Sequence, residues 1–236
     1  MVQVEWRGVL HGACIVSRVV EAVLFDLDGT LVDSAPDLAG AANDMRAARG
    51  LEALPFSALR PLVGSGARGM VGAAFGIAPG HAEFESLRDD YLARYERRLL
   101  HQTDVFAGTD AVLLAMEQAA LPWGIVTNKA TRFSKPLAAG LPVLHRCAVL
   151  VSGDSTAHTK PHPAPLLEAA RQLGVPPQRC VYVGDDLRDV QAGRAAGMTT
   201  LVAAWGYLGN AEPIDRWQAD AVLQRPHELL IWLGMA

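Results

Sequence analysis

Short apolar runs rich in β-branched residues predict buried strands in two separate parts of the chain. The first run covers residues 19–25 and ends at a pair of acids, Asp26 and Asp28. After residue 105, similar runs alternate with stretches of helical spacing. This alternation is typical of an α/β fold with a doubly wound parallel sheet. The later predicted strands cover residues 123–127, 147–151, 179–183, 199–203 and 219–223.

The stretch between these two parts shows helical spacing alone. Residues 81–101, for example, place Phe84, Leu87, Tyr91 and Tyr95 on one helical face. A helical block of about 65–70 residues between strands predicts an inserted small all-α domain. Two regions therefore follow from the pattern: an α/β core over residues 19–34 and 105–236, and an inserted helical domain over 35–104. Residues 1–18 precede the first predicted strand, and we expect this N-terminal extension either to be disordered or to precede the true start of translation.

The acids after the first strand are the first candidate for chemistry. Asp26 and Asp28 flank one apolar residue, and Gly29 then lets the backbone turn tightly. Open α/β sheets bind ligands at this carboxyl edge. One carboxylate can attack phosphorus, and the other can protonate the leaving oxygen and then activate water. Two acids this close repel each other without a divalent cation, and oxygen ligands favour Mg²⁺. The alternative is a solvated Asp-Gly turn.

Two further strand ends carry polar residues. Thr127 and Asn128 end the strand 123–127, where a hydroxyl and free N–H groups can hold phosphate oxygens. Taken alone, a threonine followed by an asparagine turn is the simpler explanation. Lys160 precedes Pro161, which restricts its backbone, and its charge could neutralise nearby acids and a phosphate.

Acids also follow the strand 179–183. Asp185, Asp186 and Asp189 lie at a predicted junction between this strand and a helix. Such acids can equally be a helix N-cap and first-turn residues that favour the helix dipole. His158 and His162 lie four residues apart, but Pro161 between them makes a metal site on one helical face doubtful.

Together, these strings resemble the four motifs of the haloacid-dehalogenase superfamily of phosphatases, over about residues 22–227. The string 25–34 resembles Asp-x-Asp-Gly-Thr-Leu-x-Asp-Ser, and 160–163 resembles Lys-Pro-x-Pro. The resemblance implies a Rossmann-type core with a helical cap, a Mg²⁺ cofactor and an aspartyl-phosphate intermediate. The implied catalytic residues are Asp26 as nucleophile, Asp28 as general acid and base, and Lys160, which stabilises the negative charge of the transferring group. The implied phosphate-binding residues are Thr127, Asn128 and Gly29. The implied metal ligands are Asp26, Asp185 and the Asp28 carbonyl, with Asp186 and Asp189 in supporting positions.

Within the superfamily, the chain is similar to the phosphoglycolate phosphatase group and resembles more closely the N-acetylmuramic acid 6-phosphate phosphatases of cell-wall recycling. The strings that carry this likeness are residues 45–50, 66–71, 123–129, 184–189 and 205–207. The implied substrate is N-acetylmuramic acid 6-phosphate, with 2-phosphoglycolate as the alternative. Both carry a carboxylate, which we expect Arg68 in the flexible loop 64–68 to bind. An ordinary interhelix turn is the competing interpretation of that loop.

Three other functions stay open. A sugar phosphomutase would use the same four motifs, and a non-catalytic binding module would keep the fold but lose a motif residue. A dehalogenase would lack the second acid, so Asp28 argues against it.

The composition of the chain limits its possible partners and location. The chain has 236 residues, half of them hydrophobic, and a net charge of −4, which argues against a nucleic-acid partner. No apolar run reaches the ~18 residues of a membrane helix, and charged residues near the start argue against a signal peptide. The three cysteines lack metal spacing, which favours reduced thiols and a cytoplasmic location. We expect a monomer or homodimer whose partner is a small phosphate ester.

Overall fold

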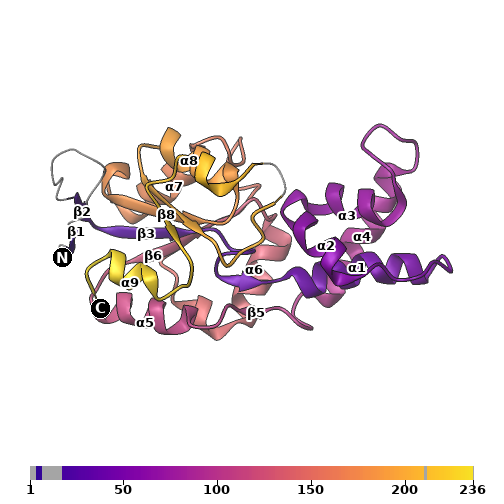
Figure 1. Ribbon diagram of the computed structural model, residues 1–236, viewed down its shortest axis with the longest axis horizontal. Helices are drawn as coiled ribbons and strands as arrows, with labels where there is room; N and C mark the ends of the chain where they lie inside the picture. The colour runs from indigo at the N-terminus through magenta and orange to yellow at the C-terminus, as the bar shows by residue number, and fades with distance from the viewer. Residues whose placement is uncertain (1–3, 7–17, 210–211, 236) are drawn as a thin grey trace.

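The computed structural model describes residues 4–6, 18–209 and 212–235, and its centre is a parallel sheet. In this described part, six strands lie in the order β10–β9–β8–β3–β6–β7, each parallel to its neighbours. The predicted α/β fold is therefore confirmed (Figure 1). The strands are β3 (Ala22–Phe25), β6 (Trp123–Val126), β7 (Val149–Val151), β8 (Cys180–Gly184), β9 (Thr199–Ala203) and β10 (Ala221–Leu223).

Helices cover both faces of the sheet because its central strand is apolar on both sides. In β3, Ala22 and Leu24 belong to the hydrophobic cluster that α7 and α8 cover. Val23 and Phe25 belong to the cluster on the opposite face, which α5, α6 and α9 cover. Figure 1 shows α7 and α8 above the sheet and α5 and α9 below it. The helices are α5 (Thr109–Gln118), α6 (Thr131–Gly140), α7 (Ala164–Leu173), α8 (Leu187–Ala195) and α9 (Glu228–Trp232).

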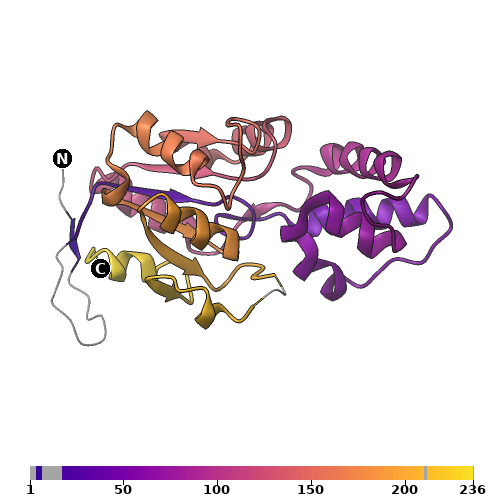
Figure 2. The ribbon, with the colours of Figure 1, turned by 90° about the horizontal axis from the view of Figure 1, so that it is seen from above.

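A bundle of helices lies beyond the carboxyl edge of the sheet (Figures 1 and 2). Its helices pack on one another, and α1 contacts both α3 and α4. Buried apolar residues continue from the sheet into this bundle, which shares one hydrophobic cluster with it. The bundle contains α1 (Ala35–Ala47), α2 (Phe56–Leu59), the 3₁₀ helix η1 (Arg60–Ser65), α3 (Gly66–Phe75) and α4 (Phe84–Arg98).

Two adjacent linkers join the bundle to the sheet. Strand β4 (Val32–Asp33) enters the bundle and strand β5 (Asp104–Val105) leaves it, and the two pair antiparallel. Asp37 in the first turn of α1 is fully buried and accepts hydrogen bonds from the N–H groups of Gln102 and Thr103. The two linkers between the sheet and the bundle are thus held together by hydrogen bonds.

Beyond these elements, three short 3₁₀ helices and a small N-terminal sheet complete the described chain. Within the expected extension, β1 (Val4–Trp6) pairs antiparallel with β2 (Arg18–Val20). The rest of the extension, 1–3 and 7–17, lies outside the described residues. The 3₁₀ helices are η2 (Pro142–Arg146), η3 (Pro177–Arg179) and η4 (Ile214–Arg216). No helix of the described residues is long and apolar enough to span a membrane.

Candidate active site

The carboxyl edge of the sheet gathers the predicted residues. Because β6 and β8 pair with β3 in parallel register, the last residues of the three strands meet at one edge. Asp26 directly follows β3, Thr127 directly follows β6 and Asp185 directly follows β8. Thr127 and Asp185 are buried, whereas Asp26 is partly accessible. Residues far apart in the chain thus share one site.

Lys160 is the cation at the centre of this site. It is buried, and its Nζ lies 2.9 Å from Asp26 Oδ1 and 2.7 Å from Asp189 Oδ1. It also donates to the Tyr182 hydroxyl at 2.8 Å. Burial lowers the pKa of Lys160, but the Asp189 and Asp26 carboxylates outweigh this effect and the pKa is raised. The lysine therefore stays charged between two acids.

Asp26 is held in one orientation. Its Oδ1 accepts hydrogen bonds from Lys160 Nζ and, at 2.7 Å, from the Leu27 N–H. Burial raises the pKa of Asp26 to about 7; Lys160 opposes this rise, and the Asp189 charge adds to it. Without a further cation, this carboxylate thus exchanges its proton near neutral pH.

Asp185 approaches Asp26 from the next strand. Thr30 Oγ1 donates to its Oδ1 at 2.9 Å, and the Tyr207 N–H donates to its Oδ2 at 2.8 Å. Burial, followed by the charges of Asp26 and Asp189, holds the pKa of Asp185 well above its usual range. Oxygen atoms of Asp26, Asp185 and Asp189 all lie within 4.8 Å of one another. Such a cluster of acids could hold a metal ion.

Within this cluster, Asp189 is already committed to other partners. Lys160 Nζ and the Tyr182 hydroxyl donate to its Oδ1, and the Asp186 N–H donates to its Oδ2. Asp189 therefore orients Lys160, which leaves Asp26 and Asp185 as the better metal ligands.

Asp186 caps a helix beside the site. It is the N-cap of α8, and its carboxylate accepts hydrogen bonds from the Arg188 N–H and guanidinium. Burial raises its pKa, but the Arg188 hydrogen bonds outweigh this and the pKa is lowered. Its carboxylate is thus engaged by the helix cap and by Arg188.

Gly29 lies in the tight turn after β3. Its N–H donates to the Val32 carbonyl at 2.9 Å and is therefore engaged within the loop. Gly29 has a φ of +88°, and a Cβ there would lie 2.1 Å from Asp185 Oδ2. Glycine is thus required for the close approach of Asp185, a contact that the sequence does not reveal.

Asn128 clamps the loop that carries Lys160. Its Nδ2 donates to the Lys160 carbonyl and its Oδ1 accepts from the Lys160 N–H, both at 2.9 Å. Both polar atoms of the side chain are therefore used to position Lys160. Thr127, by contrast, accepts a hydrogen bond from the Lys129 N–H at 3.1 Å and still has its own proton to donate.

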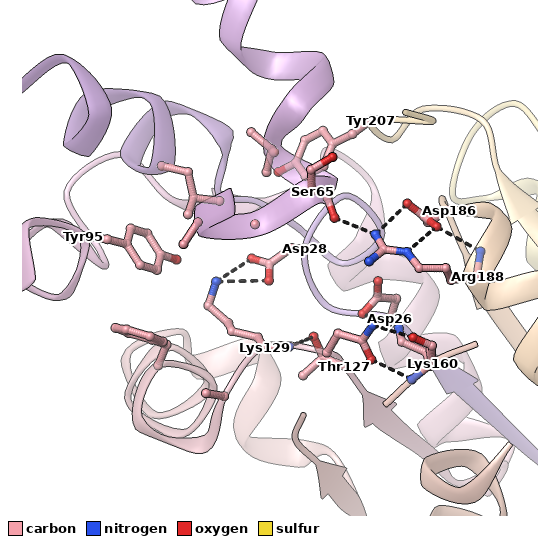
Figure 3. Close-up of a pocket in the computed structure, with 18 of the residues that line it drawn as sticks. Asp26, Asp28, Ser65, Tyr95, Thr127, Lys129, Lys160, Asp186, Arg188 and Tyr207 are labelled. Carbon is pink, nitrogen blue, oxygen red and sulfur yellow. Dashed lines mark hydrogen bonds and ion pairs between the residues drawn. The ribbon is translucent and has the colours of Figure 1, made fainter. Parts of the chain in front are cut away.

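Asp28 points away from the Lys160 cluster, toward Lys129 (Figure 3). Lys129 Nζ lies 2.9 and 3.0 Å from the two Asp28 oxygens, and Ser34 Oγ donates to Oδ1. Sequence reasoning did not identify Lys129 as a site residue. A lysine is usually solvated at the surface, and the string 123–129 alone does not reveal its partner.

Above these side chains is a cavity of about 540 Å³ between the sheet edge and the helical bundle (Figure 3). Its floor includes the acids and lysines described above, and its opposite wall comes from the bundle, mainly from Leu38, Val63, Tyr91, Leu92 and Tyr95. Segment 64–67 lines the cavity, but Arg68 is exposed and does not. The structure therefore does not bring Arg68 to the site, because only the preceding residues of η1 and α3 face it.

His158 and His162, the other possible metal-binding pair, do not form a metal site among the described residues. The His158 and His162 rings are exposed and stack with centroids 4.2 Å apart. Neither belongs to a group of potential metal ligands among the described residues.

Tyr207 links the site to the bundle and was not among the expected site residues. Its hydroxyl accepts from the N–H groups of Ser34 and Ala35 at 2.9 and 3.1 Å and donates to Asp33. Arg60 of the bundle lies over its ring, 5.0 Å from the centroid. Tyr207 belongs to the string 205–207, which contributes to the family resemblance, but the resemblance assigned no role to this tyrosine.

Comparison with known proteins agrees with this geometry. Residues 23–203 match the family model of the haloacid dehalogenase-like hydrolases. A phosphoglycolate phosphatase of Xanthomonas campestris is 47% identical over 90% of this chain and 96% of its own length. An N-acetylmuramic acid 6-phosphate phosphatase of Pseudomonas aeruginosa is 42% identical over 92% of this chain and 96% of its own length.

Solved structures give the same result for the fold. The crystal structure of a predicted phosphoglycolate phosphatase from Haemophilus somnus superposes with a TM-score of 0.79 at 25% identity, covering 90% of this chain and 97% of that one. CbbY from Rhodobacter sphaeroides, in complex with phosphate, has a TM-score of 0.72 at 24% identity, covering 91% and 99%. The relatives confirm the expected enzyme class, a phosphoric monoester hydrolase. The chain belongs to the haloacid dehalogenase-like hydrolase family, as its motifs predicted.

Proposed function

We propose that this chain is a Mg²⁺-dependent phosphomonoesterase that forms an aspartyl phosphate on Asp26. The observation that carries the proposal is the convergence of Asp26, Asp185 and Lys160 below one cavity. A nucleophile, a potential metal site and a fixed cation are the parts that phosphoryl transfer needs.

The acids suit a small divalent cation. Their oxygens lie within 4.8 Å, close to the roughly 4.2 Å between opposite ligands of an octahedral Mg²⁺. The donor set consists of oxygens, which Mg²⁺ prefers. We assign Asp26, Asp185 and the backbone carbonyl of Asp28 as ligands. The ion would supply positive charge that offsets the phosphoryl oxygens and the paired acids.

Asp26 is the proposed nucleophile. Lys160 and the Leu27 N–H fix its Oδ1, whereas Oδ2 accepts no hydrogen bond from the described residues. We assign Oδ2 to the attack on phosphorus, which breaks the bond to the leaving oxygen. The Lys160 charge and the Thr127 hydroxyl, both at the same edge, stabilise the phosphoryl oxygens during transfer.

Asp28 is the proposed general acid and base. It protonates the leaving oxygen and then takes a proton from the water that cleaves the aspartyl phosphate. Ser34 and Lys129 hold its carboxylate over the cavity, away from the metal ligands. This arrangement separates the nucleophile from the proton donor.

Residues 35–104 are the proposed cap domain, which closes the site and contacts the substrate beyond the phosphate. The cavity volume of about 540 Å³ is typical of sites for ligands of drug size. This volume favours N-acetylmuramic acid 6-phosphate over the much smaller 2-phosphoglycolate, and each has a relative named for it. A cytoplasmic location is also proposed, and the free thiols of Cys147 and Cys180 support it.

A phosphate-release panel with purified protein tests this proposal. We expect release from N-acetylmuramic acid 6-phosphate with Mg²⁺, weaker release from 2-phosphoglycolate, and at least a hundredfold loss with a chelator. A sugar 1-phosphate included in the panel distinguishes a mutase, which would move the phosphate instead of releasing it. No release from any ester would refute the proposal.

A further inference from the structure

Lys129 and Tyr95 face each other across the cavity, one from the α/β core and one from the helical bundle (Figure 3). Lys129 Nζ lies 4.7 Å from the centroid of the Tyr95 ring, and the lysine side chain is 7% exposed. This buried cation is thus enclosed by the Tyr95 ring and the Asp28 carboxylate.

The Tyr95 hydroxyl is buried and has no hydrogen-bond partner among the described residues. Buried hydroxyl groups in proteins nearly always have a partner. Burial, followed by the Asp28 charge, keeps the pKa of Tyr95 well above its usual value, so the group is a donor. Its ring lines the cavity, and the hydroxyl end points toward Lys129 and Asp28 (Figure 3). An acceptor arriving in the cavity would satisfy it.

The other cations around the cavity are less suited to a ligand. Arg188 is engaged by Asp186, and Arg88 pairs with Glu85 and Asp89. Arg132 is exposed and stacks on the Phe133 ring. Lys129 has three donors, and its partner Asp28 is an acid that must turn to the leaving oxygen during the reaction.

We propose that Lys129 Nζ and Tyr95 Oη form a subsite that binds a carboxylate on the leaving group of the substrate. The inference rests on the proposed phosphatase function and deepens it by naming the residues that select the substrate class. Because Lys129 contacts Asp28, the carboxylate must lie within a few bonds of the leaving oxygen or fold back toward it. Apolar neighbours such as Leu92 and Phe133 exclude water and strengthen the pairing.

Matched pairs of esters test the subsite. N-acetylmuramic acid 6-phosphate is compared with N-acetylglucosamine 6-phosphate, which lacks the carboxylate, and 2-phosphoglycolate is compared with ethyl phosphate. The readout is the ratio of kcat/KM within each pair, because any general loss of activity cancels. We expect Lys129→Met to lower this ratio about 10- to 100-fold and Tyr95→Phe about 3- to 10-fold, as for charged and neutral hydrogen bonds.

Lys135→Met is the matched control, because this exposed lysine of α6 does not line the cavity. It should leave the ratio unchanged, and thermal melts establish that each variant is folded. Ratios within about twofold of wild type in both Lys129→Met and Tyr95→Phe would overturn the subsite while phosphate release still supports the proposed function. A wild-type protein that hydrolyses none of the esters would overturn both.

Discussion

At the scale of single residues, Lys160 balances charges that would otherwise repel. Its ammonium lies between Asp26 and Asp189, and Asn128 fixes its backbone with two hydrogen bonds. Taking two or more carboxylates out of water is costly unless each finds a cation or donor. Asp185 has two donors but no cation among the described side chains, which is where a metal ion would complete the balance.

The raised pKa of Asp26 gives a prediction for metal binding. Without a divalent cation, the folded protein holds this proton up to about pH 7, whereas the unfolded chain releases it near 3.8. The stability from this protonation is therefore present at low pH and lost as the pH rises toward 7. Mg²⁺ must displace this proton, and the pKa of Asp185 is raised as well, so the apparent Kd should rise at least about tenfold for each pH unit below 7.

Thermal-shift titrations with Mg²⁺ at several pH values between about 5 and 8 measure this effect. The expected pattern is a larger increase in Tm at the higher pH values. An apparent Kd that stays constant from pH 5 to 8 would contradict the location of the metal beside Asp26.

Substitution of Asn128 gives a second prediction. Asn128→Ala removes both hydrogen bonds to the Lys160 backbone, so we expect kcat to fall about tenfold and the free energy of unfolding to fall by about 1–2 kcal/mol. KM should change little, because the side chain positions Lys160 instead of binding substrate. Steady-state kinetics and denaturant melts check this, and a large rise in KM with kcat unchanged would restore the phosphate-binding role.

The predicted residues that the structure brings together follow strands or lie in the Lys-Pro-x-Pro string. Asp26, Thr127 and Asp185 could be predicted because parallel strands bring their ends to one edge. The contacts of Gly29 and Asn128 could not, since they depend on residues far away in the chain: the Asp185 carboxylate lies against Gly29, and the Lys160 backbone pairs with Asn128. Such pairings depend on tertiary contacts, which the spacing of residues along the sequence does not reveal.

At the scale of elements, two contacts hold the bundle against the core beside the metal ligands. Arg188 of α8 donates to the Gly64 carbonyl in η1, and Arg60 of η1 donates to the Gly206 carbonyl at 3.3 Å. Arg60 also lies over Tyr207, whose N–H holds Asp185. The contact of η1 with the core and the position of Asp185, a proposed metal ligand, are therefore linked through Tyr207.

Arg60→Ala tests this connection. Losing the cation–π contact and the hydrogen bond should lower kcat/KM about 3- to 10-fold for every ester alike, since the phosphate end is affected. Arg68→Ala is the matched control in the same bundle, because Arg68 is exposed and does not line the cavity; its activity should stay within about twofold. Equal losses of activity in both variants would contradict the proposed link between Arg60 and the phosphate end of the site.

Element types were predicted better than their ends. The helical pattern over residues 81–101 corresponds to α4, Phe84–Arg98, whereas an earlier part of the predicted helical block divides into α2 and η1. Pro61 lacks an N–H, so a continuous α-helix loses a hydrogen bond there and the 3₁₀ turn takes over. The predicted strand 19–25 likewise divides into β2 and β3.

At the scale of the whole molecule, the cavity lies where the bundle meets the carboxyl edge of the sheet (Figure 3). The sheet and its helices could be predicted because each strand and helix carries its own periodic pattern. The cavity, and hence the facing of Tyr95 and Lys129, could not, because it depends on how the bundle is oriented by the paired linkers β4 and β5. Selection among substrates is therefore a property of the assembled molecule.

The most direct test of the account is to trap the covalent intermediate. Wild-type protein is acid-quenched during turnover of a radiolabelled phosphate ester, digested and mapped, with Asp26→Asn treated identically. We expect label on the peptide that contains Asp26, and a folded Asp26→Asn variant with neither label nor turnover. Label on a different residue, or turnover retained by Asp26→Asn, would contradict the central claim.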